Sequence, residues 1–91
     1  MFTGIIEEIG VLKRIQRGSS SLQLVIQATK VLKDVHVGDS IAVNGVCLTV
    51  TSYTVNEFTV DVMPETFYDT TLASLSTNSK VNLERAMSAN G

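Results

Sequence analysis

The fold of this 91-residue chain is decided by one stretch, Ser40-Ile41-Ala42-Val43-Asn44-Gly45-Val46-Cys47-Leu48-Thr49-Val50. Two runs rich in β-branched residues flank Asn44-Gly45, the dipeptide most typical of a two-residue type I′ hairpin. Such a turn fixes the register, so that Ser40 lies opposite Thr49 and Ala42 opposite Cys47. The stretch therefore predicts two antiparallel strands with a tight turn between them.

Alternate residues of a strand share a face, which gives this hairpin two different surfaces. One surface is apolar and is expected to face a core: Ile41, Val43, Val46, Leu48 and Val50. The other carries small, mildly polar side chains: Ser40, Ala42, Cys47, Thr49 and Thr51. The second surface is expected to face away from the core.

Further strands are expected before the hairpin. Residues 5–15 predict a first strand that bends at Gly10, because a glycine within a strand often marks a bulge. Residues 22–27 alternate apolar and polar side chains and predict a second strand. Residues 30–37 lack this alternation and have room for a helical turn.

Two more strands are expected after the hairpin. Residues 58–63 alternate and end at Pro64, and residues 81–84 alternate again. Between them, Leu72 and Leu75 are three residues apart, which predicts a short amphipathic helix within residues 70–76.

Six short strands and one short helix predict an all-β fold, a small closed or nearly closed antiparallel barrel of six strands with one short helix. Closure of the barrel removes exposed strand edges. A barrel this narrow is filled by its own side chains, so a ligand must lie outside it or at its mouth. The length predicts a single domain over residues 1–91, whose small core would gain from a dimer or a partner domain.

Composition excludes several classes of function. Seven Lys and Arg against nine Asp and Glu, without a basic cluster, make nucleic acid a poor partner. No apolar run reaches the ~18 residues of a membrane span. One cysteine and one histidine are too few for a zinc site. The start of the chain lacks the features of a signal peptide, which with the single cysteine favours a cytoplasmic location.

Four blocks of the sequence, in this order and spacing, resemble the riboflavin synthase (alpha chain) family. They are Met1–Ile5, Gly38–Ser40 with Asn44–Val50, Asp61–Thr66 and Val81–Ala86. Each block alone is weak, but the four together span nearly the whole chain and are specific. The resemblance implies a six-stranded antiparallel Greek-key barrel with one short helix, the N-terminal lumazine-binding barrel of a two-barrel enzyme.

The resemblance also implies a reaction. Enzymes of this family are transferases that convert two molecules of 6,7-dimethyl-8-ribityllumazine into riboflavin and 5-amino-6-ribitylaminopyrimidinedione, without a metal or another cofactor. The site lies between the N-terminal barrel of one subunit and the C-terminal barrel of another. An isolated N-terminal barrel is then expected to bind the lumazine or riboflavin with little or no turnover. We expect it to be a homodimer, whereas the full enzyme is a homotrimer.

The family motifs assign the site residues. Cys47 and Ser40 are the candidate catalytic residues, and whether Cys47 attacks, contacts or merely packs stays open. The candidate ligand-binding residues are Gly4, Ile5, Ile6, Cys47, Leu48, Thr49, Asp61, Val62, Met63, Pro64, Glu65 and Thr66. Asn82 is a candidate supporting polar group, and His36 is interpreted as a solvated loop residue.

Three other functions compete with this interpretation. A non-enzymatic carrier of lumazine or flavin, similar to the lumazine proteins of luminescence, would share the fold and the ligand. A flavin-binding barrel of the NAD(P)H reductase type would need an arginine-rich phosphate loop, which the sequence lacks. A purely structural module would bind no ligand.

Overall fold

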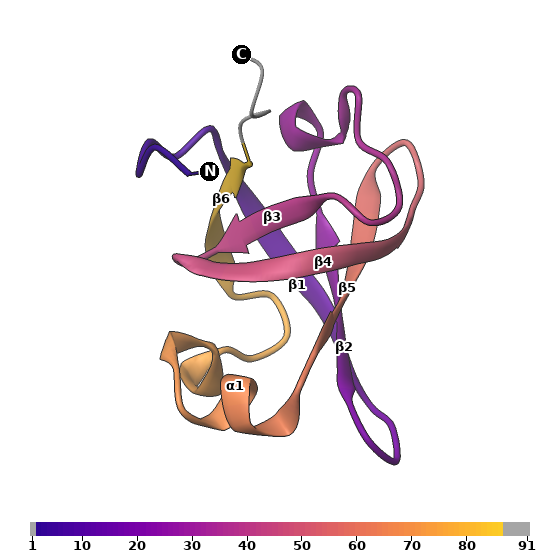
Figure 1. Ribbon diagram of the computed structural model, residues 1–91, viewed down its shortest axis with the longest axis vertical. Helices are drawn as coiled ribbons and strands as arrows, with labels where there is room; N and C mark the ends of the chain where they lie inside the picture. The colour runs from indigo at the N-terminus through magenta and orange to yellow at the C-terminus, as the bar shows by residue number, and fades with distance from the viewer. Residues whose placement is uncertain (1, 87–91) are drawn as a thin grey trace.

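The computed structural model describes residues 2–86 and shows a closed barrel of six antiparallel strands (Figure 1). The strands are β1 (Glu8–Arg17), β2 (Leu22–Gln27), β3 (Ser40–Val43), β4 (Val46–Tyr53), β5 (Glu57–Val62) and β6 (Lys80–Arg85). Their order around the barrel is β1-β2-β5-β4-β3-β6. Because β3, β4 and β5 follow one another and β6 returns beside β3, the connection is a Greek key. The predicted fold class is confirmed.

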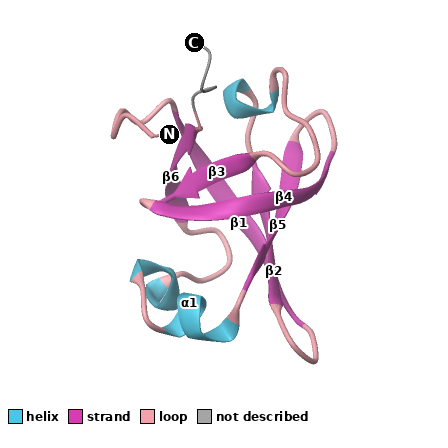
Figure 2. Ribbon diagram, in the orientation of Figure 1, coloured by secondary structure: helices cyan, strands magenta, loops and turns pink. Residues whose placement is uncertain are grey.

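Short helical segments connect the strands (Figure 2). They are the 3₁₀ turn η1 (Lys30–Leu32), the α-helix α1 (Pro64–Tyr68) and the 3₁₀ turn η2 (Thr71–Ser74). The helical turn expected within residues 30–37 is therefore present. None of the helices in residues 2–86 is long and apolar enough to cross a membrane.

The α-helix lies earlier in the chain than the sequence predicts. Pro64 occupies the first turn of α1, where its fixed φ angle suits a helix and its missing N–H is not needed. The predicted helix over residues 70–76 is instead the 3₁₀ turn η2, because Thr70 begins a new turn and its Oγ1 accepts the Leu72 N–H at 3.3 Å. Leu72 is fully buried, as the amphipathic pattern predicts.

The barrel interior is filled by apolar side chains from all six strands. Phe58 is the largest side chain that is completely buried. Around it lie the strand residues of the core: Leu12, Leu22, Leu24, Ile26, Ile41, Val43, Leu48, Val50, Val60, Val62, Val81 and Leu83. The interior thus leaves binding to the outer surface, as expected for a narrow barrel.

The irregularity in β1 does not lie at Gly10, where the sequence predicts a bulge. The register shift between β1 and β2 lies between Leu12 and Arg14. A Cβ atom at Gly10 would lie 2.7 Å from Leu83 Cδ1 and 2.8 Å from the Gln27 carbonyl oxygen. Glycine is required here because neighbouring strands approach closely. The strand itself begins at Glu8, later than expected.

The β3–β4 hairpin has the predicted geometry. Asn44 and Gly45 have φ angles of 49° and 85°, both positive as a type I′ turn requires. The paired positions include Ser40 with Thr49 and Ala42 with Cys47, so the predicted register is confirmed. Asn44 also fastens the turn to β6, because its N–H donates to the Asn82 carbonyl at 2.8 Å and its Oδ1 accepts the Asn82 N–H at 2.7 Å.

Candidate functional site

The outer surface of β3 and β4 carries the predicted polar face. Cys47 and Thr49 are exposed, and Ser40 is half-buried. The row continues across the sheet, because Thr49 is paired with Asp61 of β5 and Asp61 with Gln23 of β2. Gln23 Nε2 donates to Asp61 Oδ1 at 3.0 Å, which orients that carboxylate. Ser40 and Asp61 are two strands apart, about 10 Å, a span suited to a small heterocycle.

Three residues near this face have side chains with little exposed surface. Leu48 and Val62 belong to the core, with 4% and 3% of their surface exposed. These two can contact a ligand outside the barrel only through their main chains. Ala42 lies on the outer face as predicted, but it is covered and only 6% exposed.

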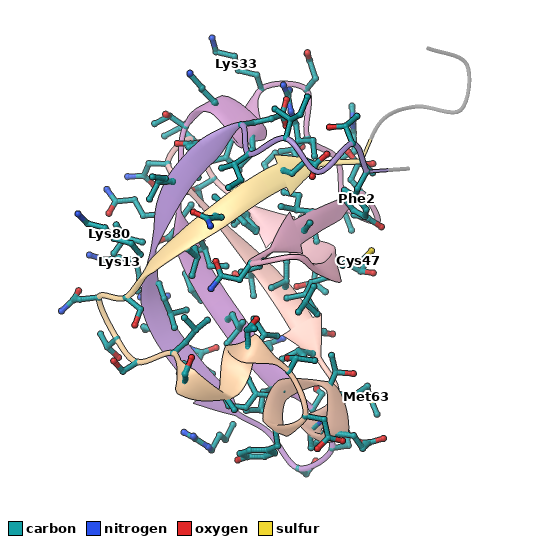
Figure 3. The ribbon with its side chains drawn as sticks, turned by 90° about the vertical axis from the view of Figure 1, so that its left-hand side faces the viewer. Phe2, Lys13, Lys33, Cys47, Met63 and Lys80 are labelled. Carbon is teal, nitrogen blue, oxygen red and sulfur yellow. The ribbon has the colours of Figure 1, made fainter. Side chains whose placement is uncertain are left out.

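β4 and β5 separate near the hairpin turn. Their ladder ends at the pair Thr49–Asp61, and residues 46–48 have no partner on β5 within the described ladder. The chain leaves β5 after Val62 and enters α1 through Met63, which has an extended backbone and is 54% exposed. Phe2, Cys47 and Met63 lie on the same side of the molecule (Figure 3). The separated strand ends leave main-chain groups that can bind the polar edge of a heterocycle.

The segment Asp61–Thr66 is therefore a strand-to-helix junction. The sequence predicts a strand end with free backbone groups here, but Pro64–Thr66 already form the first turn of α1. The Met63 carbonyl accepts the Phe67 N–H at 2.9 Å, so it is engaged. Asp61 and Glu65 remain exposed and can offer carboxylates to hydroxyl groups.

The predicted residues Gly4, Ile5 and Ile6 lie before β1 rather than inside a strand. Gly4 has a φ angle of 84°, in the left-handed region that favours glycine. Ile5 and Ile6 are 68% and 53% exposed, which is unusual for such apolar side chains. This short segment lies beside the end of β6 (Figure 1).

A pocket of about 270 Å³ lies between this segment, the hairpin turn and β6. Its lining residues are Gly4, Ile6, Ala42, Asn44, Gly45, Asn82, Leu83 and Glu84. The structure therefore brings Gly4 and Ile6 to the pocket, together with Asn82. Cys47 is not in the lining, but it is paired with Ala42, which is. The pocket and the Cys47 face are thus neighbours on the outer surface.

Glu84 is a polar residue of this region that the sequence analysis misses. Its carboxylate accepts hydrogen bonds from the N–H and the hydroxyl of Thr3 and from the N–H of Gly4. The Thr3 hydroxyl, and then these N–H groups, lower the pKa of Glu84 below its ordinary value in spite of its burial. The alternation in β6 predicts that Glu84 lies on a solvent-exposed face. Only the folded structure shows that the N-terminal segment covers it.

Two further carboxylates organise the chain around the barrel. Glu7 forms a two-point ion pair with Arg85, with both Nε–Oε1 and Nη2–Oε2 at 3.0 Å, and the Arg85 guanidinium lowers the pKa of Glu7. Burial raises the pKa of Glu8, but N–H groups of Val31 and Thr29 outweigh it and lower the value overall.

His36 is exposed in its loop, as expected. Among residues 2–86, no cluster of three or more His, Cys, Asp or Glu is placed to hold a metal.

Comparison with known proteins finds full-length matches to this chain. Riboflavin synthase of Bacillus subtilis (strain 168) is 60% identical over 91 residues, and that of Actinobacillus pleuropneumoniae is 62% identical. Each alignment covers 100% of this chain and 42% of the relative. The chain therefore spans less than half the length of these curated relatives.

Solved structures share the fold at low identity. LumP complexed with riboflavin and LumP complexed with 6,7-dimethyl-8-(1'-D-ribityl) lumazine both give a TM-score of 0.83 at 23% identity. The matches cover 93% of this chain and 47% and 49% of the respective LumP chains. The family model described as the lumazine binding domain matches residues 3–86, nearly all of the sequence. With a barrel of the matching fold, this chain belongs to the lumazine-binding domain family.

Proposed function

We propose that this chain is the N-terminal barrel of a riboflavin synthase and that it binds 6,7-dimethyl-8-ribityllumazine or riboflavin on its outer surface. One observation carries the proposal. This chain is 60% identical to a riboflavin synthase over all 91 of its own residues, and it presents an exposed thiol, Cys47, on an open polar face. At Cys47 the strand β4 is no longer paired with β5.

The ligand is proposed to lie across this face. Its flat ring rests against Cys47 and Thr49, beside the backbone of Leu48 and Val62, and its polar edge bonds to main-chain groups left free where the β4–β5 ladder ends. The hydroxyl groups of the ribityl chain reach Asp61, Met63 and the turn that holds Pro64, Glu65 and Thr66. The segment Gly4–Ile6, with Ile5 exposed, closes the opposite side.

Turnover is proposed only for the full enzyme, in which a second barrel presents a second lumazine. One lumazine donates a four-carbon unit to the other, so the two products account for all atoms and no metal or redox cofactor is needed. Holding two reactants in contact can supply roughly 7–11 kcal/mol of the barrier. Cys47 is proposed to contact the reacting ring, where a thiolate can add to it, and Ser40 to handle a proton.

We also infer the assembly and location. The isolated barrel is proposed to pair as a homodimer, the commonest closed symmetry, and the full enzyme to be a homotrimer. The single cysteine suits a reducing cytoplasm. Sedimentation of the chain with and without riboflavin tests the dimer.

The competing carrier function rests on the fold shared with LumP, whose structures contain riboflavin, flavin mononucleotide or the lumazine. The two functions differ in turnover. If this chain, mixed with an intact C-terminal barrel, forms no riboflavin from the lumazine, the carrier function is favoured.

Binding itself is tested by titrating riboflavin fluorescence with the purified chain. We expect quenching, and we expect bound riboflavin to slow alkylation of Cys47, whose adduct is unambiguous because the chain has one cysteine. Lys80→Ala is the control, since Lys80 lies on the side away from Cys47 (Figure 3). No quenching at high micromolar protein would favour a purely structural module.

A further inference from the structure

Glu84 is the one charged side chain that is buried among residues 2–86, with 8% of its surface exposed. Along β6, Val81 and Leu83 point into the core, so Glu84 points to the outer surface. It is buried because the N-terminal segment, residues 2–6, lies over it. The contact joins parts of the chain 80 and 81 residues apart.

The hydrogen bonds to Glu84 are numerous and converge on one carboxylate. The Thr3 N–H and the Thr3 hydroxyl both donate to Oε2, the hydroxyl at 2.7 Å. The Gly4 N–H lies 3.1 Å from each carboxylate oxygen. Hydrogen bonds to an ionised acceptor are stronger than those between neutral groups. The Glu84 carboxylate therefore binds two main-chain N–H groups and one side-chain hydroxyl of this segment.

The N-terminal segment has no comparable attachment elsewhere on the described barrel. Residues 2–6 belong to no strand, and β1 begins only at Glu8. The first main-chain bond to β6 runs from the Glu7 N–H to the Leu83 carbonyl, at 2.8 Å. Among residues 2–86, the hydrogen bonds that fix Thr3 and Gly4 to the barrel all end on Glu84.

The register places this attachment close to the proposed ligand face. Glu84 is paired with Ala42 on β3, and Ala42 is paired with Cys47 on β4. The three residues form one row on the outer surface, and Glu84 lies roughly 10 Å from Cys47. Ala42, the smallest side chain of the row, leaves the pocket of about 270 Å³ between the segment and the hairpin turn.

We propose that Glu84 is a positioning residue, whose carboxylate holds residues 2–6 beside the Cys47 face so that bound riboflavin or lumazine is enclosed between them. This inference rests on the proposed function. Glu84 itself does not touch the ligand ring. It acts through Thr3 and Gly4, which set the position of Phe2, Ile5 and Ile6.

Titration of riboflavin fluorescence with the wild-type chain, Glu84→Gln and Glu84→Ala tests the proposal. We expect the Kd to rise about tenfold in Glu84→Gln, because the charge-assisted bonds are lost, and further in Glu84→Ala. Thr3→Val removes one donor from the exposed side without touching the barrel, and a smaller rise is expected. Amide exchange by NMR, without ligand, should be faster at Thr3 and Gly4 in Glu84→Gln.

Glu7→Gln is the matched control. It makes the same charge change beside the same segment, but its partner is Arg85 and not Thr3 or Gly4. We expect its Kd to stay within about twofold of the wild type. An unchanged Kd in both Glu84→Gln and Thr3→Val, or an equal rise in Glu7→Gln, overturns the positioning role. If the wild type binds neither riboflavin nor the lumazine, the proposed function fails, and the exchange data still report whether Glu84 holds the segment.

Discussion

The two surfaces of β4 differ in exposure and in chemistry. Leu48 and Val50 point into the barrel and are 4% and 0% exposed. Cys47 and Thr49 point outward and are exposed. A shift of one residue in register would exchange the two sets. Stability is therefore expected to depend on the inner surface, whereas ligand binding is proposed for the outer one, and substitutions can test each separately.

The largest effect is expected from Leu48→Ala on the inner surface. Removing a buried leucine leaves a cavity and should lower the free energy of unfolding by about 2–5 kcal/mol. Urea denaturation of the variant and the wild type measures this difference. Thr49→Ala is the matched control on the outer surface and should cost less than about 1 kcal/mol. Equal losses in the two variants would contradict the separation of the two surfaces.

A smaller loss of stability is expected when a methyl group is added where two strands pack closely. Gly10→Ala places a methyl group against Leu83 and the Gln27 carbonyl, and overpacking of this kind costs about 1–3 kcal/mol. Gly45→Ala is the comparison, because a Cβ there meets no atom within 4 Å and only the positive φ angle of 85° opposes it, at roughly 1 kcal/mol. Melting temperatures should rank the Gly10 variant lower. If the Gly45 variant instead melts at the lower temperature, the positive φ angle in the turn matters more for stability than the close approach of the strands at Gly10.

The inner surface and the hairpin could be predicted from the sequence because both depend on local information. Asn44-Gly45 sets the turn type, and the alternation that follows it sets the faces. Those two facts are sufficient for the register of Ser40 with Thr49 and of Ala42 with Cys47. The exposure of Cys47 follows from the same argument.

The remainder of the site depends on contacts between distant residues, which no local pattern encodes. The bonds between Glu84 and Thr3 join residues 81 apart, so the alternation in β6 could only place Glu84 on a wet face. The need for glycine at position 10 comes from two neighbouring strands that pack against it, and the sequence does not show which strands are neighbours. The helix α1 was obscured because Pro64 both ends a strand and begins a helix. The contacts proposed for Asp61–Thr66 stay predictions.

The inner and outer surfaces of the barrel also differ in their titratable groups, and therefore in how they affect stability at low pH. The inner surface carries no titratable group among the described core residues, whereas Glu7, Glu8 and Glu84 on the outside have pKa values lowered in the folded state. The unfolded chain then binds more protons in acid, so stability is present above the ordinary value of 4.5 and is lost as the pH falls below it. Denaturation at a series of pH values should show this loss. Glu7→Gln should make the slope shallower, and an unchanged slope would contradict the assignment.

The smallest effect on stability is expected from Cys47→Ser. The side chain is exposed, so the free energy of unfolding should stay within about 0.5 kcal/mol of the wild type. The same change replaces the thiol with a hydroxyl of similar size, so the Kd for riboflavin and the rate of riboflavin formation with a C-terminal barrel report different properties. If Cys47 only contacts the ring, the Kd rises and the rate falls by a similar factor. If it attacks the ring, the rate falls far more than the affinity, because a neutral hydroxyl is a much weaker nucleophile than a thiolate. A change in neither quantity, at unchanged stability, would show that the outer surface of β4 is not the ligand face.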